Sequence, residues 1–247
     1  MRLVRQAFPD RPAFDMAVTH ALLRRVAEGA LPALVRVFRP GPTVAFGRLD
    51  ALAPGYAAAA AAARAHGAEP VLRLGGGHAA AYAPGAVLVE AVLPQHAIAE
   101  GLEDRFRAGV GWMMDALAEA GVRAQVGELP GEYCAGEWSV HAGGVKLAGL
   151  AQRSIRGAAL LTGFVIAEGG PALRALLTDV YAALGLDWDP ATAGAADAVA
   201  PHVTDAAVEA ALVRATGVGA TAEPLALDAR TLELAHELEP GHVVTAR

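Results

Sequence analysis

The sequence is short of several residues on which whole classes of protein depend. Among its 247 residues there is one cysteine, which excludes a disulfide framework and a zinc site built from several thiolates. The longest apolar run, residues 56–63, is mostly alanine and too short to cross a bilayer. Arg2, Arg5 and Asp10 interrupt the N-terminal stretch in which a signal peptide would need an apolar core. We therefore expect a cytoplasmic protein with no membrane partner.

Basic charge is also scarce. The 20 Lys and Arg residues are outnumbered by 26 Asp and Glu residues, which gives a formal net charge of −6 and a pI near 5.7. This balance argues against a nucleic-acid partner, and no basic run offsets it. With 54% hydrophobic and 19% charged residues, the chain has the composition of a folded globular protein. Its length suits one large domain, or one domain with an appendage.

Lysine is nearly absent. Lys146 is the single lysine among the 20 basic residues. Arginine is a planar, permanently charged fork and lysine is a compact point charge, so the remaining lysine either marks a position where arginine does not serve or survives by chance. The single cysteine, Cys134, lies only twelve residues upstream. A nearby ammonium favours the nucleophilic thiolate. The alternative is that Cys134 is a small buried hydrophobe in a hairpin with a polar edge.

The periodicity of apolar residues predicts a mixed fold. Spacings of three and four residues predict helices, and short apolar runs bounded by Gly or Pro predict strands. The expected helices are residues 14–28, 55–66, 103–120, 171–184, 205–216 and 228–237. The expected strands are residues 34–38, 44–47, 70–74, 86–93, 122–126, 138–141, 145–152 and 158–167.

The order of these elements favours one fold class. Strands follow one another without an intervening helix over residues 137–167, so we expect an α+β fold with a mixed, largely antiparallel sheet flanked by helices. The pattern turns wholly helical near residue 170. We therefore expect a catalytic domain over 1–170 and a helical C-terminal extension, 171–247, packed on it.

Three consecutive glycines, Gly75, Gly76 and Gly77, follow one predicted strand. Glycine lets backbone amides approach the oxygen atoms of a ligand closely. The spacing fits neither a dinucleotide-binding loop nor a P-loop, and a tight structural turn explains it equally well. Arg73, just before the glycines, is either an anion ligand or a solvated strand residue.

Three motifs together resemble the biotin/lipoate A/B protein ligase family. Residues 144–153, Gly-Val-Lys-Leu-Ala-Gly-Leu-Ala-Gln-Arg, are similar to its G-x-K-x-x-G-x-A-Q-R signature. Residues 73–79, Arg-Leu-Gly-Gly-Gly-His-Ala, resemble its R-x-[ST]-G-G-x-A stretch, and residues 82–85, Tyr-Ala-Pro-Gly, resemble its Y-H-x-P-G. The motifs stand in the family's order, and the resemblance covers roughly residues 10–170.

The resemblance implies an acyltransferase with a cysteine nucleophile. In the branch whose cysteine precedes the lysine strand, Cys134 would carry an acyl thioester, and Lys146 would orient the acyl carbonyl and support the thiolate. An octanoyl or lipoyl group would pass from an acyl carrier thioester to Cys134. It would then pass to a lysine of a lipoyl domain or of a glycine-cleavage H protein. The residues expected to bind the acyl substrate are Arg73, Gly75, Gly76, Gly77, His78, Ala79, Tyr82, Gly149, Ala151 and Gln152.

Two other interpretations stay open. An ATP-dependent lipoate-protein ligase would form lipoyl-adenylate with ATP and Mg²⁺, and a non-catalytic relative would bind an acyl group or a lipoyl domain without turnover. Leu72 replaces the first Arg of the ligases' double-Arg version, which removes a cation suited to ATP phosphates and favours the transferase. Biotin ligation is disfavoured because the usual glycine- and arginine-rich biotin loop is missing. We expect a monomer with no tightly bound cofactor and no metal site.

The chain departs from the family pattern at a few positions. Gly75 stands where the family often has Ser or Thr, and Ala83 stands where it has His. Ala135 replaces the Pro that usually follows the cysteine, which is expected to loosen the cysteine loop.

Overall fold

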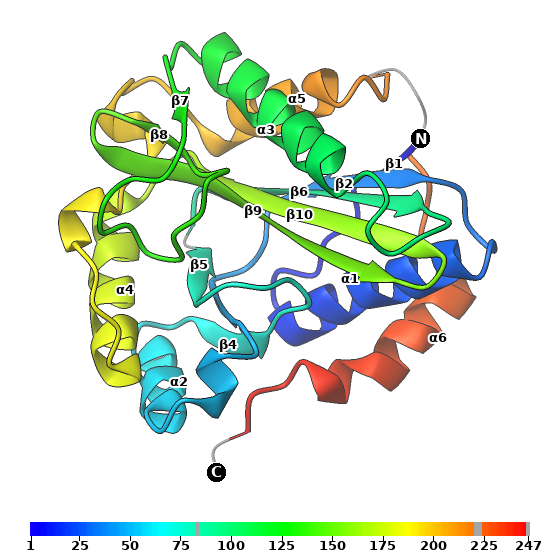
Figure 1. The fold of residues 1–247 in the computed structure, drawn as a ribbon, viewed down its shortest axis with the longest axis horizontal. Coiled ribbons are helices and arrows are strands. Elements are labelled where there is room, and N and C mark those ends of the chain that lie inside the picture. Colours follow the sequence, from blue (N-terminus) through cyan, green and yellow to red (C-terminus); the bar gives the residue numbers. More distant parts are fainter. Residues whose placement is uncertain (83, 220–223, 246–247) are drawn as a thin grey trace.

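The computed structural model describes residues 1–82, 84–219 and 224–245, and two β-sheets form the centre of this part of the chain (Figure 1). The larger sheet has the strand order β1-β2-β6-β10-β9-β8-β7. β1 pairs with β2 in parallel, and the other neighbours pair antiparallel. The strands are β1 (Arg2–Val4), β2 (Leu34–Phe38), β6 (Ala86–Pro94), β7 (Gln125–Val126), β8 (Val140–Ala142), β9 (Val145–Ile155) and β10 (Ala158–Ile166). The expected α+β fold with a mixed, largely antiparallel sheet is confirmed.

A smaller sheet has the strand order β4-β3-β5. Its strands are β3 (Thr43–Phe46), β4 (Glu69–Leu72) and β5 (Ala80–Tyr82). β4 runs parallel to β3 and leads directly into Arg73 and the three glycines, after which the chain returns as β5 on the other side of β3. The glycine stretch is therefore the loop between the two outer strands of this sheet.

Helices cover both faces of the larger sheet. They are α1 (Pro12–Ala27), α2 (Tyr56–Ala65), α3 (Leu102–Glu119), α4 (Gly170–Leu184), α5 (Asp205–Ala215) and α6 (Ala229–Leu238). Figure 1 shows α3 and α5 on one face and α1 and α6 on the other, with α2 and α4 beside the smaller sheet. α2 forms from a run of alanines, the residue with the highest helix propensity, and buries Ala59, Ala60 and Ala63.

The C-terminal helices each pack on an element from the first half of the chain. α4 packs against α2, α5 against α3, and α6 against α1. The buried apolar clusters are accordingly shared: Leu177 of α4 belongs to the cluster of Phe46, and Leu212 of α5 to that of Met113. The division of the chain at residue 170 into two domains stays a prediction.

Short elements depart from the sequence-based expectation. β1 and β5 are not predicted, because three residues are too few to show a periodicity. The strand expected over 122–126 is limited to β7, because the Val122 N–H donates to the carbonyl of Leu117 and closes the end of α3. The first arm of the expected hairpin begins at Val140 rather than at residue 138, because the Ser139 N–H donates to the carbonyl of Gly136 and forms a turn there.

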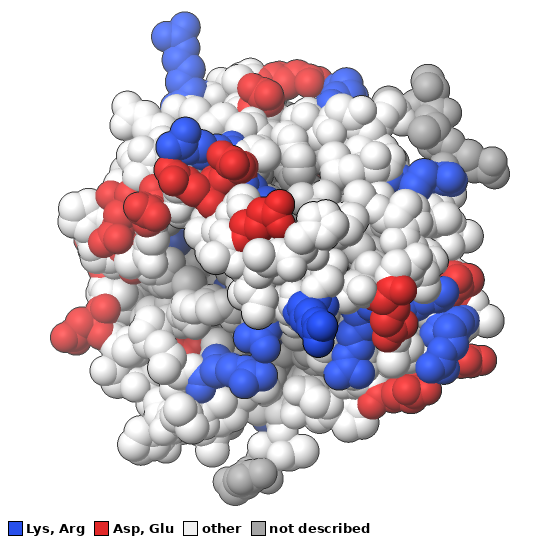
Figure 2. Space-filling model, turned by 45° about the vertical axis from the view of Figure 1, so that its right-hand side comes forward, with Lys and Arg blue, Asp and Glu red and all other residues white. Residues whose placement is uncertain are grey.

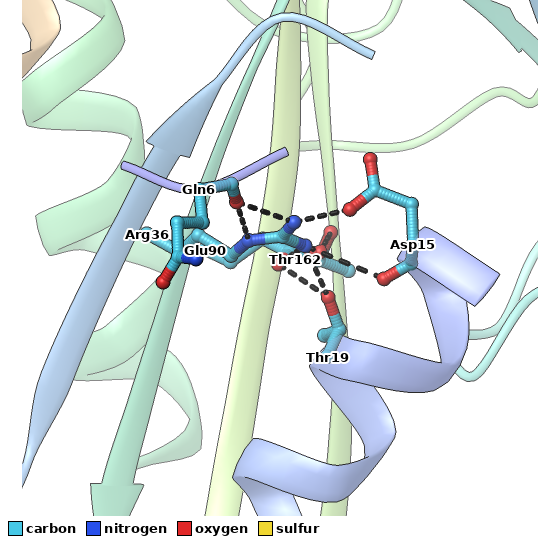
Figure 3. Close-up of polar contacts among 6 residues, drawn as sticks. All are labelled: Gln6, Asp15, Thr19, Arg36, Glu90 and Thr162. Carbon is cyan, nitrogen blue, oxygen red and sulfur yellow. Dashed lines mark hydrogen bonds and ion pairs between the residues drawn. The ribbon is translucent and has the colours of Figure 1, made fainter. Parts of the chain in front are cut away.

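A buried ionic cluster joins α1, β2, β6 and β10 (Figure 3). The Arg36 guanidinium, fully buried on β2, pairs with Asp15 of α1 and lies 3.8 Å from Glu90 of β6. Thr19 and Thr162 each donate a hydroxyl hydrogen bond to the Glu90 carboxyl group, at 2.6 and 3.3 Å. Burial raises the pKa of Glu90, against the opposing influence of Arg36 and Thr19. The cluster ties these four elements together.

The molecular surface carries both signs of charge. On the face in Figure 2, acidic and basic side chains lie interspersed, so the net charge of −6 does not form one continuous acidic field there. Within the described ranges, no helix combines the length and the apolar character that crossing a bilayer requires.

Candidate active site

Cys134 lies on the loop between β7 and β8, in a backbone conformation that is rare for its residue type. Its φ of +44° makes it the one non-glycine residue with a positive φ among those that the structure describes. The left-handed region costs an L-residue roughly 1–2 kcal/mol, and such strain clusters at functional sites. The Cys134 N–H donates to Tyr181 Oη at 2.8 Å, and this hydroxyl donates to the carbonyl of Ala79 at 2.9 Å. Helix α4 therefore holds the cysteine loop against β5.

The cation beside the sulfur atom is Arg73. Its terminal nitrogen Nη2 donates to Cys134 Sγ at 3.3 Å and to the carbonyl of His78 at 2.6 Å. Arg73 is only 8% exposed. Burial alone would lower the pKa of Arg73, but the negative charges that Cys134, Tyr82 and Tyr181 can carry, together with the hydrogen bond to Cys134, outweigh it, and the pKa is raised. The arrangement keeps the guanidinium ionised directly beside the sulfur atom.

Gly77 allows this contact. Its φ is +88°, and a Cβ atom on it would lie 2.8 Å from both Arg73 Nη2 and Cys134 Sγ. Any other residue would push the guanidinium and the sulfur apart, so glycine is required here by space as well as by backbone conformation.

Lys146, at the start of β9, contacts the main chain of the cysteine loop. Its Nζ donates to the carbonyls of Tyr133 and Cys134 at 3.0 and 2.9 Å, and it lies 3.6 Å from Glu132 Oε1. Burial lowers the pKa of Lys146, while the charges of Cys134 and Glu132 oppose the shift. The ammonium thus fixes the carbonyl groups that flank the cysteine. The structure also leaves room for its stem, because Gly149 has no side chain where the Lys146 Cε passes.

Glu132 closes the loop from the other side. Its Oε1 accepts hydrogen bonds from the Ser139 hydroxyl at 2.6 Å and from the Gly136 N–H at 3.1 Å. The carboxylate therefore draws residues 136–139 toward Lys146 and gives the loop a defined shape despite Ala135 in place of a proline.

A cavity of about 490 Å³ opens beside the sulfur atom, within the size range of small-molecule sites. The cavity lining includes the charged side chains of Arg73, Glu137 and Lys146 together with several apolar side chains. Phe106 of α3 and Trp138 of the cysteine loop both line it and stack on each other, with ring centroids 5.5 Å apart and planes 2° from parallel. The lining residues are Arg73, Gly76, Gly77, Tyr82, Leu102, Phe106, Cys134, Ala135, Gly136, Glu137, Trp138, Ser139, Lys146, Gly149, Leu150, Ala151, Gln152, Thr162, Gly163 and Phe164. Such a cavity suits an apolar chain whose reactive end lies at the cysteine.

Residues 11–177 match the sequence profile of the lipoyl protein ligase A/B catalytic domain. The chain belongs to this family. The resemblance found in the motifs is thereby confirmed, and the matched range includes both Cys134 and Lys146.

Curated relatives of this ligase A/B family chain share one name, octanoyl-[GcvH]:protein N-octanoyltransferase. The protein of that name from Geobacillus kaustophilus is 31% identical over 178 residues, which cover 70% of this chain and 63% of the relative. The one from Exiguobacterium sibiricum is 30% identical over 152 residues, which cover 61% of this chain and 55% of the relative. The chain thus matches about six tenths of the length of these relatives.

Solved structures of the family share the fold. The structure of lipoate-protein ligase A bound with ATP superposes with a TM-score of 0.73 at 18% identity and covers 97% of this chain and 94% of that one. The putative lipoate protein ligase Ta0514 from T. acidophilum superposes equally well at 17% identity, with the same coverage. At this identity the likeness concerns the fold alone.

Within this ligase A/B domain, the structure brings most of the expected site residues to the cavity. Cys134, Lys146, Arg73, Gly76, Gly77, Tyr82, Gly149, Ala151 and Gln152 all line it. Gly75, His78 and Ala79 do not. Gly75 packs against β9, where a Cβ would lie 2.7 Å from the Ala151 Cβ, which explains glycine in place of the usual Ser or Thr. Ala83, which stands where the family has His, lies outside the described residues.

Several residues of the site are not predicted from the sequence. Tyr181, Glu132 and the stacked pair Phe106 and Trp138 carry no motif of their own, and they reach the site from separate elements. The one signal in the sequence that points to Glu132 is its position two residues before the single cysteine. A carboxylate that is buried there needs a cation as its partner. In the described ranges, no cluster of three or more His, Cys, Asp or Glu side chains could hold a metal ion.

Proposed function

We propose that the protein is an acyltransferase that moves an octanoyl or lipoyl group to a protein lysine through a thioester on Cys134. The observation that carries this proposal is the position of Cys134, which lines the cavity with Arg73 Nη2 3.3 Å from its sulfur atom. A buried cation next to a partly exposed cysteine favours the thiolate, the form that attacks carbonyl groups. The relatives' shared name, with its octanoyl group and GcvH, supports the same chemistry.

In the first half-reaction, the Cys134 thiolate attacks the acyl carbonyl carbon. A carbon–sulfur bond forms, and we propose that the backbone amides of Gly76 and Gly77, which both line the cavity, donate to the oxyanion of the tetrahedral intermediate. The bond to the donor then breaks: a thioester donor departs as a thiolate, and the nitrogen of an amide donor takes up a proton from solvent and departs as an amine. Lys146 holds the Tyr133 and Cys134 carbonyls in place by donating a hydrogen bond to each.

In the second half-reaction, a lysine of the acceptor attacks the thioester. The lysine ammonium first loses a proton to solvent. A carbon–nitrogen bond then forms, the carbon–sulfur bond breaks, and its electron pair returns to Cys134 beside Arg73, while the second proton that the nitrogen loses passes to the departing sulfur or to solvent. We propose that the partners are GcvH, a lipoyl domain and an acyl carrier protein, and that the protein works as a monomer without a tightly bound cofactor. The substrate is the acyl thioester or octanoyl-GcvH itself.

The test is a transfer assay without ATP. Octanoyl acyl carrier protein and octanoyl-GcvH serve in turn as donors, with an unmodified lipoyl domain as the acceptor. We expect transfer from at least one donor, and Cys134→Ser to lower it by about 10³-fold or more. Transfer that requires ATP and free lipoate, and that survives Cys134→Ser, would instead establish a ligase that forms lipoyl-adenylate. Binding of the lipoyl domain without any turnover would establish a non-catalytic relative.

A further inference from the structure

We propose that Glu137 receives the acceptor lysine where the cavity opens to solvent, and stabilises the positive charge on the lysine nitrogen during its attack on the thioester. The inference rests on the proposed function and adds a substrate-binding group to it. The charged side chains that line the cavity are Arg73, Glu137 and Lys146. Glu137 is the carboxylate among them, and the proposed reaction brings a cation to it.

The two cations of the lining lie on the buried side of the cavity. Arg73 and Lys146 are both buried and contact the cysteine, Arg73 at the sulfur and Lys146 at the carbonyl. Positive charge at this depth suits a thiolate, but it repels an approaching ammonium ion. Glu132, buried 3.6 Å from Lys146 Nζ, offsets part of it. Glu137 is exposed, so the cavity presents a carboxylate to solvent and holds its cations deeper inside.

A tight turn holds Glu137 in this position. The Ser139 N–H donates to the carbonyl of Gly136 at 3.0 Å, so Glu137 and Trp138 are the two central residues of the turn. Glu132 Oε1 accepts hydrogen bonds from the Gly136 N–H and the Ser139 hydroxyl, which fixes both ends of it. Cys134 precedes Glu137 by three residues, so their Cα atoms are at most about 11 Å apart. The carboxylate is thus carried by a fixed part of the loop that carries the nucleophile.

The Glu137 carboxylate is available to a ligand. None of the ion pairs within the described ranges involves it. The exposed carboxylates of Glu103, Glu119 and Glu233, by contrast, each pair with an arginine. A lysine that binds Glu137 therefore displaces water and breaks no ion pair of the protein.

The aromatic pair beside Glu137 suits the stem of a lysine. Trp138 and Phe106 stack on each other, and both line the cavity. Leu102, 47% exposed, belongs to the same lining. A lysine stem packs along apolar surface while its charged end stays in a polar environment, and an ammonium ion is attracted to aromatic rings. Glu137 and these side chains together match an apolar stem that ends in a cation.

The lysine nitrogen carries positive charge at two stages of the step. It arrives as an ammonium ion and loses one proton to solvent. When the free amine forms the carbon–nitrogen bond, the nitrogen becomes positive again and the former carbonyl oxygen becomes negative. The second proton then passes to the departing sulfur or to solvent, the carbon–sulfur bond breaks, and its electron pair goes to Cys134. Because Glu137 stabilises the nitrogen at both stages, it should raise kcat/KM for the acceptor.

The experiment compares two nucleophiles on one octanoyl-enzyme. Cys134 is acylated with p-nitrophenyl octanoate, and the isolated octanoyl-enzyme is mixed with a lipoyl domain or with 2-mercaptoethanol. The lysine gains positive charge as it attacks, whereas the thiol attacks as an anion. For Glu137→Gln we expect transfer to the lysine to fall about tenfold and transfer to the thiol to stay within about twofold of the parent. About 0.5 M salt should reduce the difference between the two proteins.

Two further variants test the sign of the charge. Glu137→Asp keeps the carboxylate and should retain most of the transfer to the lysine. Glu137→Lys reverses the charge, so it should lower transfer to the lysine below that of Glu137→Gln and raise transfer to the thiol. The matched control is Glu128→Gln, which changes an exposed glutamate of the same loop that lies outside the cavity lining, and which should leave both rates unchanged.

The ratio of the two rates decides the outcome, because a variant that is merely distorted loses both reactions. An equal lysine-to-thiol ratio in the parent and in Glu137→Gln would overturn the inference, whether both rates are kept or both fall together. A parent protein that forms no octanoyl-enzyme, or whose octanoyl-enzyme transfers to no lysine, would contradict the proposed function itself.

Discussion

Two cations lie around Cys134, and they contact different parts of it. Arg73 donates to the sulfur, whereas Lys146 donates to the carbonyl groups of the cysteine and its neighbour. A hydrogen bond to a charged partner contributes about 1.5–3 kcal/mol, and of the two cations only the Arg73 guanidinium makes such a bond to the sulfur itself. The expected role of Lys146 toward the acyl carbonyl stays a prediction, and its contacts point to loop geometry as the means.

The first prediction concerns Arg73→Gln. Removing the cation from the sulfur should slow alkylation of Cys134 by iodoacetamide at neutral pH by about tenfold, the factor that corresponds to about 1.4 kcal/mol. Because the chain has one cysteine, the rate at which the protein gains the mass of the label measures alkylation of Cys134 alone. Arg153→Gln, an exposed change on β9, is the control and should leave the rate unchanged. An unchanged alkylation rate in Arg73→Gln would show that the guanidinium does not promote the reaction of Cys134.

The second prediction concerns Lys146→Ala. The change leaves two loop carbonyls without their donor and Glu132 buried without its cation, which should lower the free energy of unfolding by about 3 kcal/mol and abolish transfer. Urea unfolding and the transfer assay measure the two effects. Full transfer activity in this variant would contradict the assignment of the loop.

At the scale of elements, the C-terminal segment supports the strand that carries Arg73. The Leu72 N–H donates to the His242 carbonyl at 3.0 Å, and His242 Nδ1 donates to the Leu72 carbonyl at 2.7 Å. His242 Nε2 also lies 3.1 Å from His20 Nδ1 of α1. The last described residues therefore fasten β4 to α1 immediately before the site loop.

The third prediction follows from this histidine pair. Burial, and then the His242 charge, lower the pKa of His20 from 6.5 to about 4. The unfolded chain therefore binds more protons between these values, so stability is full above about pH 6.5 and falls as the pH drops toward about 4. We expect a loss on the order of 1–3 kcal/mol over this window, reduced in His20→Gln, as measured by urea unfolding at pH 7.5 and 4.5. An identical pH dependence in the variant would contradict the role of the pair.

At the scale of the whole molecule, one buried cation links both halves of the larger sheet to α1. Arg36 pairs with Asp15 and donates two hydrogen bonds to the carbonyl of Gln6, at 3.0 and 2.7 Å. Through Glu90 and Thr162 the same cluster reaches β10, whose Thr162 lines the cavity. The buried cluster around Arg36 is therefore connected by hydrogen bonds to a residue that lines the cavity.

The fourth prediction concerns Arg36→Met. The change leaves Asp15 and Glu90 buried without their cation, which should destabilise the fold by about 3–5 kcal/mol. Glu90→Gln, which keeps the shape and removes a charge that burial already disfavours, should cost much less. Urea unfolding of both variants tests the difference, and equal losses would show that packing rather than charge sets the cost.

How far the sequence predicts this structure depends on the range of the interactions. The long strands β6, β9 and β10 and all six helices of the described chain follow from local periodicity, and Cys134 and Lys146 stand out by rarity alone. Arg36 gives no such signal, because the partners that allow its burial lie 21 and 54 residues away along the chain. Tyr181 likewise reaches the site only through tertiary packing. Local patterns reveal the elements and the two rare residues, Cys134 and Lys146, and the supporting contacts require the fold.

The most direct test of the account is the intact mass of the protein after mixing with octanoyl acyl carrier protein or octanoyl-GcvH in the absence of ATP. The account predicts one octanoyl adduct that hydroxylamine removes, that maps to Cys134 and that is absent from Cys134→Ser. An adduct that resists hydroxylamine and persists in Cys134→Ser would contradict it, as would no adduct from either donor in a protein that transfers octanoyl groups.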